Sequence, residues 1–423
     1  MNRFIKKFGE IIGNTLEENP EKVLSLLNTA YAASGFQMRH FPGKDLLPHE
    51  KYAAVVCNRV MRKPLREPES SAVVNIFLPC ELLQASGISP LFVEGFSGYL
   101  NGAGAEKPFI DYSEKSGIPK TYCSYHKTLI GAAISGVLPK PQFVVNTTFI
   151  CDANNLSFRK LAGYWDVPHF TIDVPSGGGK ENLDYLTKQF RELRTFIEDV
   201  TGNKIDLEEL RGIMRRENRS LRVYRSYFRE IAGKFMSNTL TSEMYKLFFT
   251  HVLFGTPEAE EYFQMLLQDA TEAPAKDKEI RILWMQVLPY WQESIREILN
   301  HSGKYQLLCT NMNFDALTDA DENDPFESMA KRLLYNTLGG SGEDRINTSI
   351  EMARKLNADG AVYFNHWGCK QTIGTSLLAK EMFEDAGIPL LILDGDGCDR
   401  NNVNDGQMVT KLQAFLEILE AAK

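Results

Sequence analysis

QFVVNTTFI (residues 142–150) is an almost uninterrupted apolar and β-branched run, and VPHFTID (residues 167–173) is a second run of the same kind. A helical stretch, CDANNLSFRKLAGYWD (residues 151–166), separates them. Runs of this type, spaced by helices, are typical of parallel strands that are buried on both faces of a sheet. Residues 142–175 therefore predict a strand–helix–strand unit of an α/β fold.

The same alternation continues in both directions along the chain. Upstream, residues 72–78 form an apolar run followed by Pro79, a residue type favoured at the first position of a helix, and residues 89–93 predict the next strand. Downstream of a polar connector at 271–279, strands are expected to end at 306–309 and to span 359–364 and 388–393, with helices at 325–335, 344–356, 372–386 and 406–422. The expected fold class is α/β, with two Rossmann-like doubly wound lobes of parallel strands plus N-terminal and central helical segments.

A chain of 423 residues is too long for one compact core, so several domains are expected. The predicted division is an N-terminal helical segment at 1–66, a first α/β lobe at 67–178, a helical middle at 179–275 and a second α/β lobe at 276–423. The stretch 98–117 has the character of an insertion within the first lobe.

Composition and charge exclude some classes of protein. The net charge of -8 argues against a nucleic-acid surface, and no apolar run is long enough for a membrane helix. The first residues, MNRFIKKFGEIIGN, are amphipathic and lack the features of a secretory signal. A cytoplasmic location with no membrane and no nucleic-acid partner is expected.

The seven cysteines contain no CxxC pair, and their number is odd. Disulfides are not expected, and zinc ribbons or ferredoxin motifs are absent. Cys123, Cys151 and Cys369 fall at predicted strand ends or strand-to-helix turns, the edge of a parallel sheet where ligands bind. Two facing lobes would bring them together as ligands of a cubane iron–sulfur cluster. From the spacing alone, the alternative interpretation stays open that these cysteines are small buried hydrophobic residues, the usual role of free cysteine.

The sequence around these cysteines carries a resemblance to a family. Residues 151–175 pair a Cys-Asp at a strand end with a strand of the type xPxFxIDxP, and residues 358–371 and 386–417 place a Gly-Cys after a strand and then GIPLLILDGD. Residues 77–95 contain a P-x-E motif in Pro79 and Glu81, and residues 121–133 surround Cys123. From about residue 70 to the end, the chain resembles the superfamily of 2-hydroxyacyl-CoA dehydratase and benzoyl-CoA reductase subunits.

This resemblance implies a [4Fe-4S] cluster between two lobes, an acyl-CoA substrate and a homologous subunit in a hetero- or homodimer. It also implies a separate ATP-dependent iron–sulfur activator protein that injects one electron, so that water leaves a 2-hydroxyacyl-CoA through a ketyl radical. Two alternatives stay open within the superfamily. One is an ATP-dependent reductase of benzoyl-CoA or double-cubane [8Fe-9S] type, and the other is a non-catalytic subunit that relays electrons.

Further site residues are expected beside the three cysteines. Glu81, at a helix start within the P-x-E motif, is the candidate acid for proton transfer, although a carboxylate is also favoured there by the helix dipole. Cys309 ends a predicted strand and is a possible fourth ligand. His126, His366 and Arg345 are candidates for contacts with the substrate or cluster, and capping or surface roles are the alternative for each.

Overall fold

The computed structural model describes residues 3–315 and 317–423 and contains two parallel four-stranded sheets. The first sheet has the order β2-β1-β3-β4, formed by β1 (Ser71–Val74), β2 (Ser89–Phe92), β3 (Phe143–Thr147) and β4 (His169–Ile172). The second has the order β6-β5-β7-β8, formed by β5 (Ile280–Met285), β6 (Tyr305–Thr310), β7 (Gly360–His366) and β8 (Leu390–Gly395). The two sheets thus share one strand order, and in each the direction of winding reverses beside the first strand.

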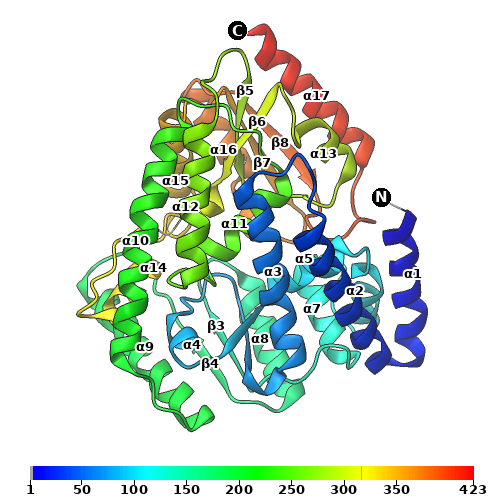
Figure 1. Cartoon of the computed structure of the whole chain (residues 1–423), viewed down its shortest axis with the longest axis vertical. Helices are drawn as coiled ribbons and strands as arrows, with labels where there is room; N and C mark the ends of the chain where they lie inside the picture. The colour runs from blue at the N-terminus through cyan, green and yellow to red at the C-terminus, as the bar shows by residue number, and fades with distance from the viewer. Residues whose placement is uncertain (1–2, 316) are drawn as a thin grey trace.

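Helices cover both sheets, so the expected α/β fold with two lobes is confirmed (Figure 1). In the first lobe they are α4 (Glu81–Ala85), α5 (Val93–Gly102), α6 (Glu106–Lys115), α7 (Ser124–Ile134) and α8 (Asp152–Trp165). In the second lobe they are α13 (Glu293–Leu299), α14 (Pro325–Leu334), α15 (Gly342–Lys355), α16 (Lys370–Asp385) and α17 (Asp405–Ala421).

Two further groups of helices complete the chain. The N-terminal group is α1 (Arg3–Glu18), α2 (Pro20–His40) and α3 (Pro48–Arg66), and the central group is α9 (Lys180–Thr201), α10 (Leu207–Ile231), α11 (Leu240–Thr250) and α12 (Pro257–Glu272). Short 3₁₀ turns, η1 (Pro68–Ser70) and η2 (Asn311–Asn313), follow α3 and β6. Helix α10 packs along α12 and also contacts α4 and α14, so the central helices link the two lobes.

The core explains why the strands are almost wholly apolar. On β5, Leu283 and Met285 belong to a hydrophobic cluster that extends through the first lobe and the central helices. Ile282 and Trp284, on the opposite face, join a second cluster under α13 and α17. Because successive side chains point to opposite faces, a strand that is buried on both faces must be apolar at every position.

The strands are shorter than the apolar runs predicted. The run 142–150 forms a strand only to Thr147, because the chain turns at Ile150, whose φ is 55°. The stretch 98–117, predicted as an insertion, lies mostly in α5 and α6, which cover α7.

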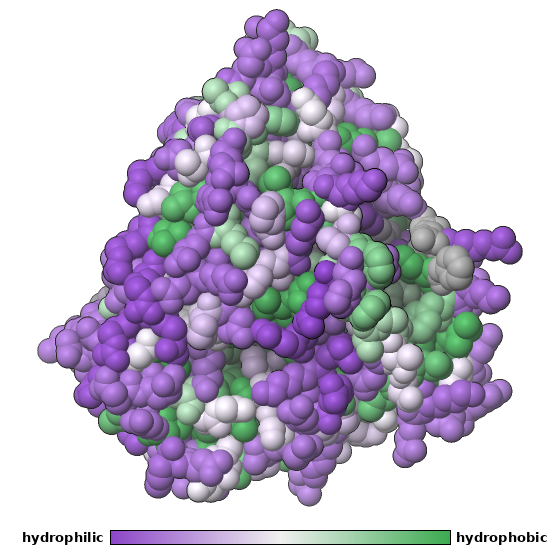
Figure 2. All heavy atoms as spheres, in the orientation of Figure 1, coloured by the Kyte–Doolittle hydropathy of each residue, from purple (hydrophilic) through white to green (hydrophobic). Residues whose placement is uncertain are grey.

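Hydrophilic residues predominate on the face of the molecule shown in Figure 2. Scattered apolar residues on such a surface are ordinary. Among the described residues, no helix combines the length and the apolar character needed to cross a bilayer.

Candidate functional site

Three cysteines stand immediately before helices. Cys151 follows β3 and Cys369 follows β7, whereas Cys123, which was also predicted at a strand end or strand-to-helix turn, lies in the turn between α6 and α7. Cys123 is the N-cap residue of α7, Cys151 that of α8 and Cys369 that of α16. A helix N-terminus carries a partial positive charge and unpaired backbone N–H groups, so it stabilises negative charge nearby. All three cysteines therefore lie at helix ends that can stabilise a negatively charged group bound there.

All three cysteines line one cavity of about 150 Å³, together with His126 and His366. Its walls come from both lobes and from α11, and they are mainly apolar, with Phe77, Phe92, Phe248 and Leu288 among the lining residues. An apolar pocket with a few convergent polar groups is the usual form of a cofactor or small-molecule site.

The thiols of Cys123 and Cys151 are difficult to ionise without added positive charge. Burial, followed by repulsion from the other two cysteines, raises the pKa of Cys123 well above its ordinary value. Burial, followed by the charge of Glu94, raises the pKa of Cys151 to about 12. A bound metal cluster supplies the positive charge that removes this penalty.

The arrangement of these donors fits a cluster better than a single ion. In residues 3–315 and 317–423, no three His, Cys, Asp or Glu side chains are close enough together to hold one metal ion. In a cubane each cysteine binds a different iron, so its donors surround a volume instead of meeting at a point. Three cysteines around one cavity match that requirement.

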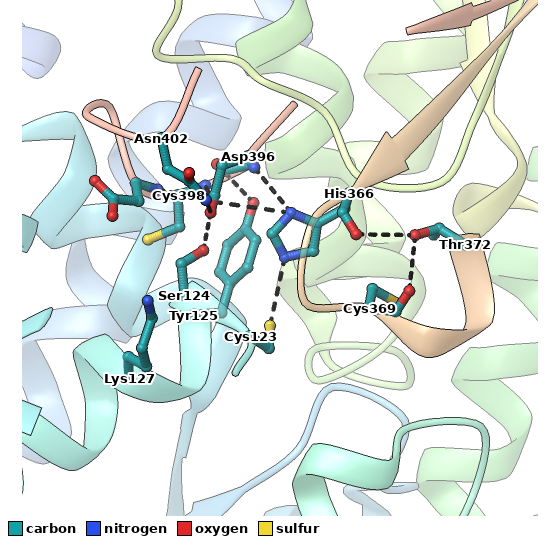
Figure 3. Close-up of polar contacts among 12 residues, drawn as sticks. Cys123, Ser124, Tyr125, Lys127, His366, Cys369, Thr372, Asp396, Cys398 and Asn402 are labelled. Atoms are coloured by element: carbon teal, nitrogen blue, oxygen red, sulfur yellow. Dashed lines mark hydrogen bonds and ion pairs between the residues drawn. The ribbon is translucent and has the colours of Figure 1, made fainter. Parts of the chain in front are cut away.

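Both histidines contact cysteine sulfurs. His366 Nε2 lies 3.4 Å from Cys123 Sγ, and His126 Nε2 lies 3.7 Å from Cys151 Sγ (Figure 3 shows the His366 contact). Burial lowers the pKa of His126 to about 3 and also lowers that of His366, so both imidazoles are neutral at physiological pH.

Asp396, in the loop after β8, holds the surroundings of Cys123 in place. Its carboxylate accepts hydrogen bonds from Ser124 Oγ at 2.5 Å and from the backbone N–H groups of Cys398 and Asp399 at 2.9 Å (Figure 3). Asn402 donates to its second oxygen at 3.1 Å. The second lobe thereby fixes the first residue of α7, next to Cys123.

Glu81 lies outside the pocket. It is fully buried at the start of α4 and forms an ion pair with Arg332, which also pairs with Glu217 at 2.5 Å. The pocket lining does not include Glu81, so its position does not support the expected role in proton transfer. The P-x-E motif located a helix start correctly, but the carboxylate has a cationic partner elsewhere.

Cys309 and Arg345 are not among the lining residues either. Cys309 is buried on β6, where burial, followed by the charge of Glu243, raises its pKa. Arg345, in the first turns of α15, is 8% exposed, and its guanidinium forms no ion pair among the described residues. Burial lowers the pKa of the Arg345 guanidinium, and the neighbouring Tyr363 and Cys369 oppose this change.

Glu94 is a pocket residue that the sequence analysis did not identify. It lines the cavity just after β2 and accepts a hydrogen bond from Ile76 N–H at 3.2 Å. Burial raises its pKa to about 7. The rule that selected the cysteines, a polar residue at a strand end, would have found it, because Glu94 is the first charged residue after the predicted strand 89–93.

The backbone beside Cys151 is strained. Ile150 lines the pocket with a φ of 55°, and Gln286, which also lines it, has a φ of 73°. A β-branched residue with a positive φ is a conformational outlier, and such strain gathers at functional sites.

Comparison with known proteins gives a consistent picture. The family model for the D-component of 2-hydroxyglutaryl-CoA dehydratase matches residues 75–419. The chain is 23% identical to the alpha subunit of (R)-phenyllactyl-CoA dehydratase from Clostridium sporogenes, over 82% of this chain and 88% of that subunit. It is 22% identical to the alpha subunit of lactoyl-CoA dehydratase from Anaerotignum propionicum, over 81% and 89% of the two chains. The beta subunit of the C. sporogenes enzyme is also 22% identical, over 81% and 90%.

Proposed function

Because this chain belongs to the family of the 2-hydroxyglutaryl-CoA dehydratase D-component, we propose that it is an iron–sulfur subunit of an enzyme that removes water from a 2-hydroxyacyl-CoA. Cys123, Cys151 and Cys369 would hold a [4Fe-4S] cluster. The observation that carries this proposal is that the three cysteines, each preceding a helix, line one apolar cavity between the lobes.

When bound, such a cluster supplies a single electron for reduction of the thioester carbonyl to a ketyl radical and a Lewis-acidic iron for oxygen. The chain supplies the surroundings for that chemistry. Apolar walls such as Phe77 and Phe248 exclude water, and the helix N-termini of α7, α8 and α16 favour negative charge.

Glu94 is the carboxyl group best placed to accept or return a proton in this site. It lines the cavity, whereas Glu81 does not, and its pKa of about 7 lets it exchange a proton near neutral pH. In the dehydration, the β-proton of the acyl group would pass to a base and the hydroxyl group would leave as water.

The proposed substrate is the acyl-CoA thioester, and Arg345 is a candidate for contact with one of its anionic groups. A buried guanidinium without an ion pair is a suitable partner for a phosphate or carboxylate. The proposed protein partners are a homologous subunit and an ATP-dependent iron–sulfur activator. The relatives are named as alpha and beta subunits, which supports a complex of related chains.

The positions of the remaining cysteines favour one cubane per chain over a double cubane. Among the described residues, Cys123, Cys151 and Cys369 are the cysteines that line the cavity, and Cys309 lies on β6 outside it. A double-cubane reductase needs more ligands than this cavity offers.

The test is an iron and sulfide count on protein purified without oxygen. About four irons per chain are expected, with most of the iron lost in Cys123→Ala, Cys151→Ala and Cys369→Ala. Cys57→Ala is the control, because Cys57 is a buried cysteine that does not line the cavity. No iron after anaerobic reconstitution would refute the proposal, and about eight irons would favour the double-cubane reductase.

A further inference from the structure

Two of the three proposed ligands, Cys123 and Cys151, each face a buried imidazole. His366 and His126 are each 2% exposed, and each directs Nε2 towards a cysteine sulfur. No hydrogen bond to Cys369 Sγ is found among the residues that the structure describes. The surroundings of the three sulfurs are therefore unequal.

The tautomer of His366 follows from its second ring nitrogen. The backbone N–H of Gly397 donates to His366 Nδ1 at 3.1 Å, so Nδ1 must be the acceptor. Asp396 Oδ1 lies 3.8 Å from the same nitrogen, which is too far for a hydrogen bond. In the neutral ring the proton is then on Nε2, which points at Cys123 Sγ.

The loop that carries Gly397 is itself held in position. Asp396 accepts hydrogen bonds from Ser124 Oγ and from the N–H of Cys398, so the loop cannot rotate its Gly397 N–H away without breaking them. The ring of His366 also packs edge-on against Tyr125, with centroids 5.6 Å apart. Figure 3 shows the imidazole between this loop and Cys123.

His126 has a comparable arrangement on the other ligand. Its Nδ1 lies 2.9 Å from Ser157 Oγ, while Tyr122 directs its own hydroxyl proton to the carbonyl of Ala153 at 2.9 Å. Ser157 Oγ also lies 3.0 Å from the Tyr122 hydroxyl, so its proton has two possible acceptors and this contact leaves both His126 tautomers open. A thiolate at Cys151 can only accept a hydrogen bond, so it favours the tautomer that carries the proton on Nε2, which faces Cys151 Sγ.

We propose that His366 and His126 are positioning residues that donate N–H···S hydrogen bonds to the Cys123 and Cys151 thiolates and thereby raise the reduction potential of the bound cluster. This inference rests on the proposed function, since it requires the cluster. Reduction adds one electron, delivered by the activator, and neither breaks a bond nor moves the histidine proton. The sulfurs become more negative in the reduced state, so the hydrogen bonds strengthen and stabilise that state.

The test is the midpoint potential of the reconstituted cluster, measured by an EPR-monitored redox titration. His366→Leu should make reduction about tenfold less favourable, which corresponds to a decrease of about 59 mV for one electron. His366→Gln, whose amide can still donate, should restore most of the change. His169→Leu is the control, because His169 is half-buried on β4 and does not line the cavity.

A second measurement does not depend on a variant that keeps its cluster. Wild-type protein with ¹⁵N-labelled histidine should show a weak ¹⁵N coupling at the reduced cluster in pulsed EPR spectra. An unchanged potential in cluster-loaded His366→Leu, or the absence of any histidine coupling, would overturn this inference and leave the proposed function intact. Wild-type protein that binds no iron would overturn both.

Discussion

The buried carboxyl group of Glu94 should make the free energy of unfolding depend on pH. Burial raises its pKa from 4.5 to about 7. Between these values the folded carboxyl group keeps its proton and the unfolded one loses it, so stability falls as the pH rises through this range. At about 1.4 kcal/mol per pKa unit, the loss is at most about 3.5 kcal/mol. Urea denaturation of wild-type protein and Glu94→Gln across this range should show that the variant lacks the decrease.

The control for this prediction is Glu17→Gln, which removes a carboxyl group whose side chain is 79% exposed. Its pH profile should match that of the wild type. A decrease of equal size in wild type and Glu94→Gln would show that another group is responsible.

Gly368, in the second lobe, lies directly against the backbone of Cys123 in the first lobe. Its φ is +83°, and a Cβ added there would lie 2.9 Å from Cys123 N and Cα. We expect Gly368→Ala to lower both the iron content and the free energy of unfolding, because the new methyl group displaces the Cys123 backbone. Gly387→Ala is the matched control: its φ is +70° but no atom lies within 4 Å, so only a backbone cost of about 1–2 kcal/mol is expected.

Gly368→Ala should be compared with Gly387→Ala by urea denaturation and by iron analysis. Equal effects of the two substitutions would mean that the contact with Cys123 is unimportant. A full iron content in Gly368→Ala would lead to the same conclusion.

For single residues, the sequence predicted which cysteines lie at the site, but it did not predict the hydrogen-bond and ion-pair partners of the residues around them. Cys151 and Cys369 follow strands of different sheets, so each was expected at a ligand-binding sheet edge, and it is the packing of the two lobes that brings both to one cavity with His366. The ion pair between Glu81 and Arg332 joins residues far apart in the sequence, and no local pattern reveals it. Asp396 was missed for the same reason, since its partner Ser124 is in the other lobe.

Among the helices, a buried ion triad ties α4, α10 and α14 together. Arg332 on α14 pairs with Glu81 on α4 and Glu217 on α10, and all three side chains are at most 9% exposed. Arg332→Met leaves two buried carboxylates without a cation, so we expect a loss of about 3–5 kcal/mol in the free energy of unfolding. Arg59→Met, which removes an ion pair with side chains 57% and 35% exposed, should cost about 1 kcal/mol or less.

Glu81→Gln separates the structural role of this residue from a catalytic one. If the triad is structural, the variant loses stability but keeps its activity per folded molecule. A stable variant without activity would return Glu81 to the role in proton transfer that its sequence motif indicates.

The elements themselves were predicted well where an apolar run had clear ends. Residues 388–393 and 359–364 correspond closely to β8 and β7. The strand β5 was not singled out, because its sequence, IRILWM, includes Arg281, which is buried. Arg281 escapes the usual cost by donating to the carbonyls of Ile231 and Ala232 at the end of α10.

In the whole molecule, the loop between β8 and α17 (residues 396–404) connects the two lobes through polar contacts. Within it, Arg400 pairs with Glu106 of α6 at 3.1 Å, and the carbonyl of Cys398 accepts from Asn101 of α5 at 2.5 Å. We therefore expect the two lobes to unfold together. Tryptophan fluorescence, which reports mainly on Trp284, Trp291 and Trp367 of the second lobe, should follow the same denaturation curve as far-UV circular dichroism.

Two separate transitions would contradict this expectation and show that the lobes are energetically independent. The predicted boundaries at residues 66, 178 and 275 can be tested at the same time, because limited proteolysis should cut first where few contacts cross. Resistance at all three positions would indicate one cooperative unit.

The division of the three cysteines between the lobes also sets an order of events during protein synthesis. Cys123 and Cys151 leave the ribosome long before Cys369, which follows β7 near the end of the chain. A nascent chain that has completed the first lobe thus exposes two thiols that cannot yet close a three-cysteine site. If the proposed cluster binds, its insertion is a post-translational step that waits for β7 and β8. Truncated chains would then reach the iron–sulfur assembly machinery as incomplete acceptors.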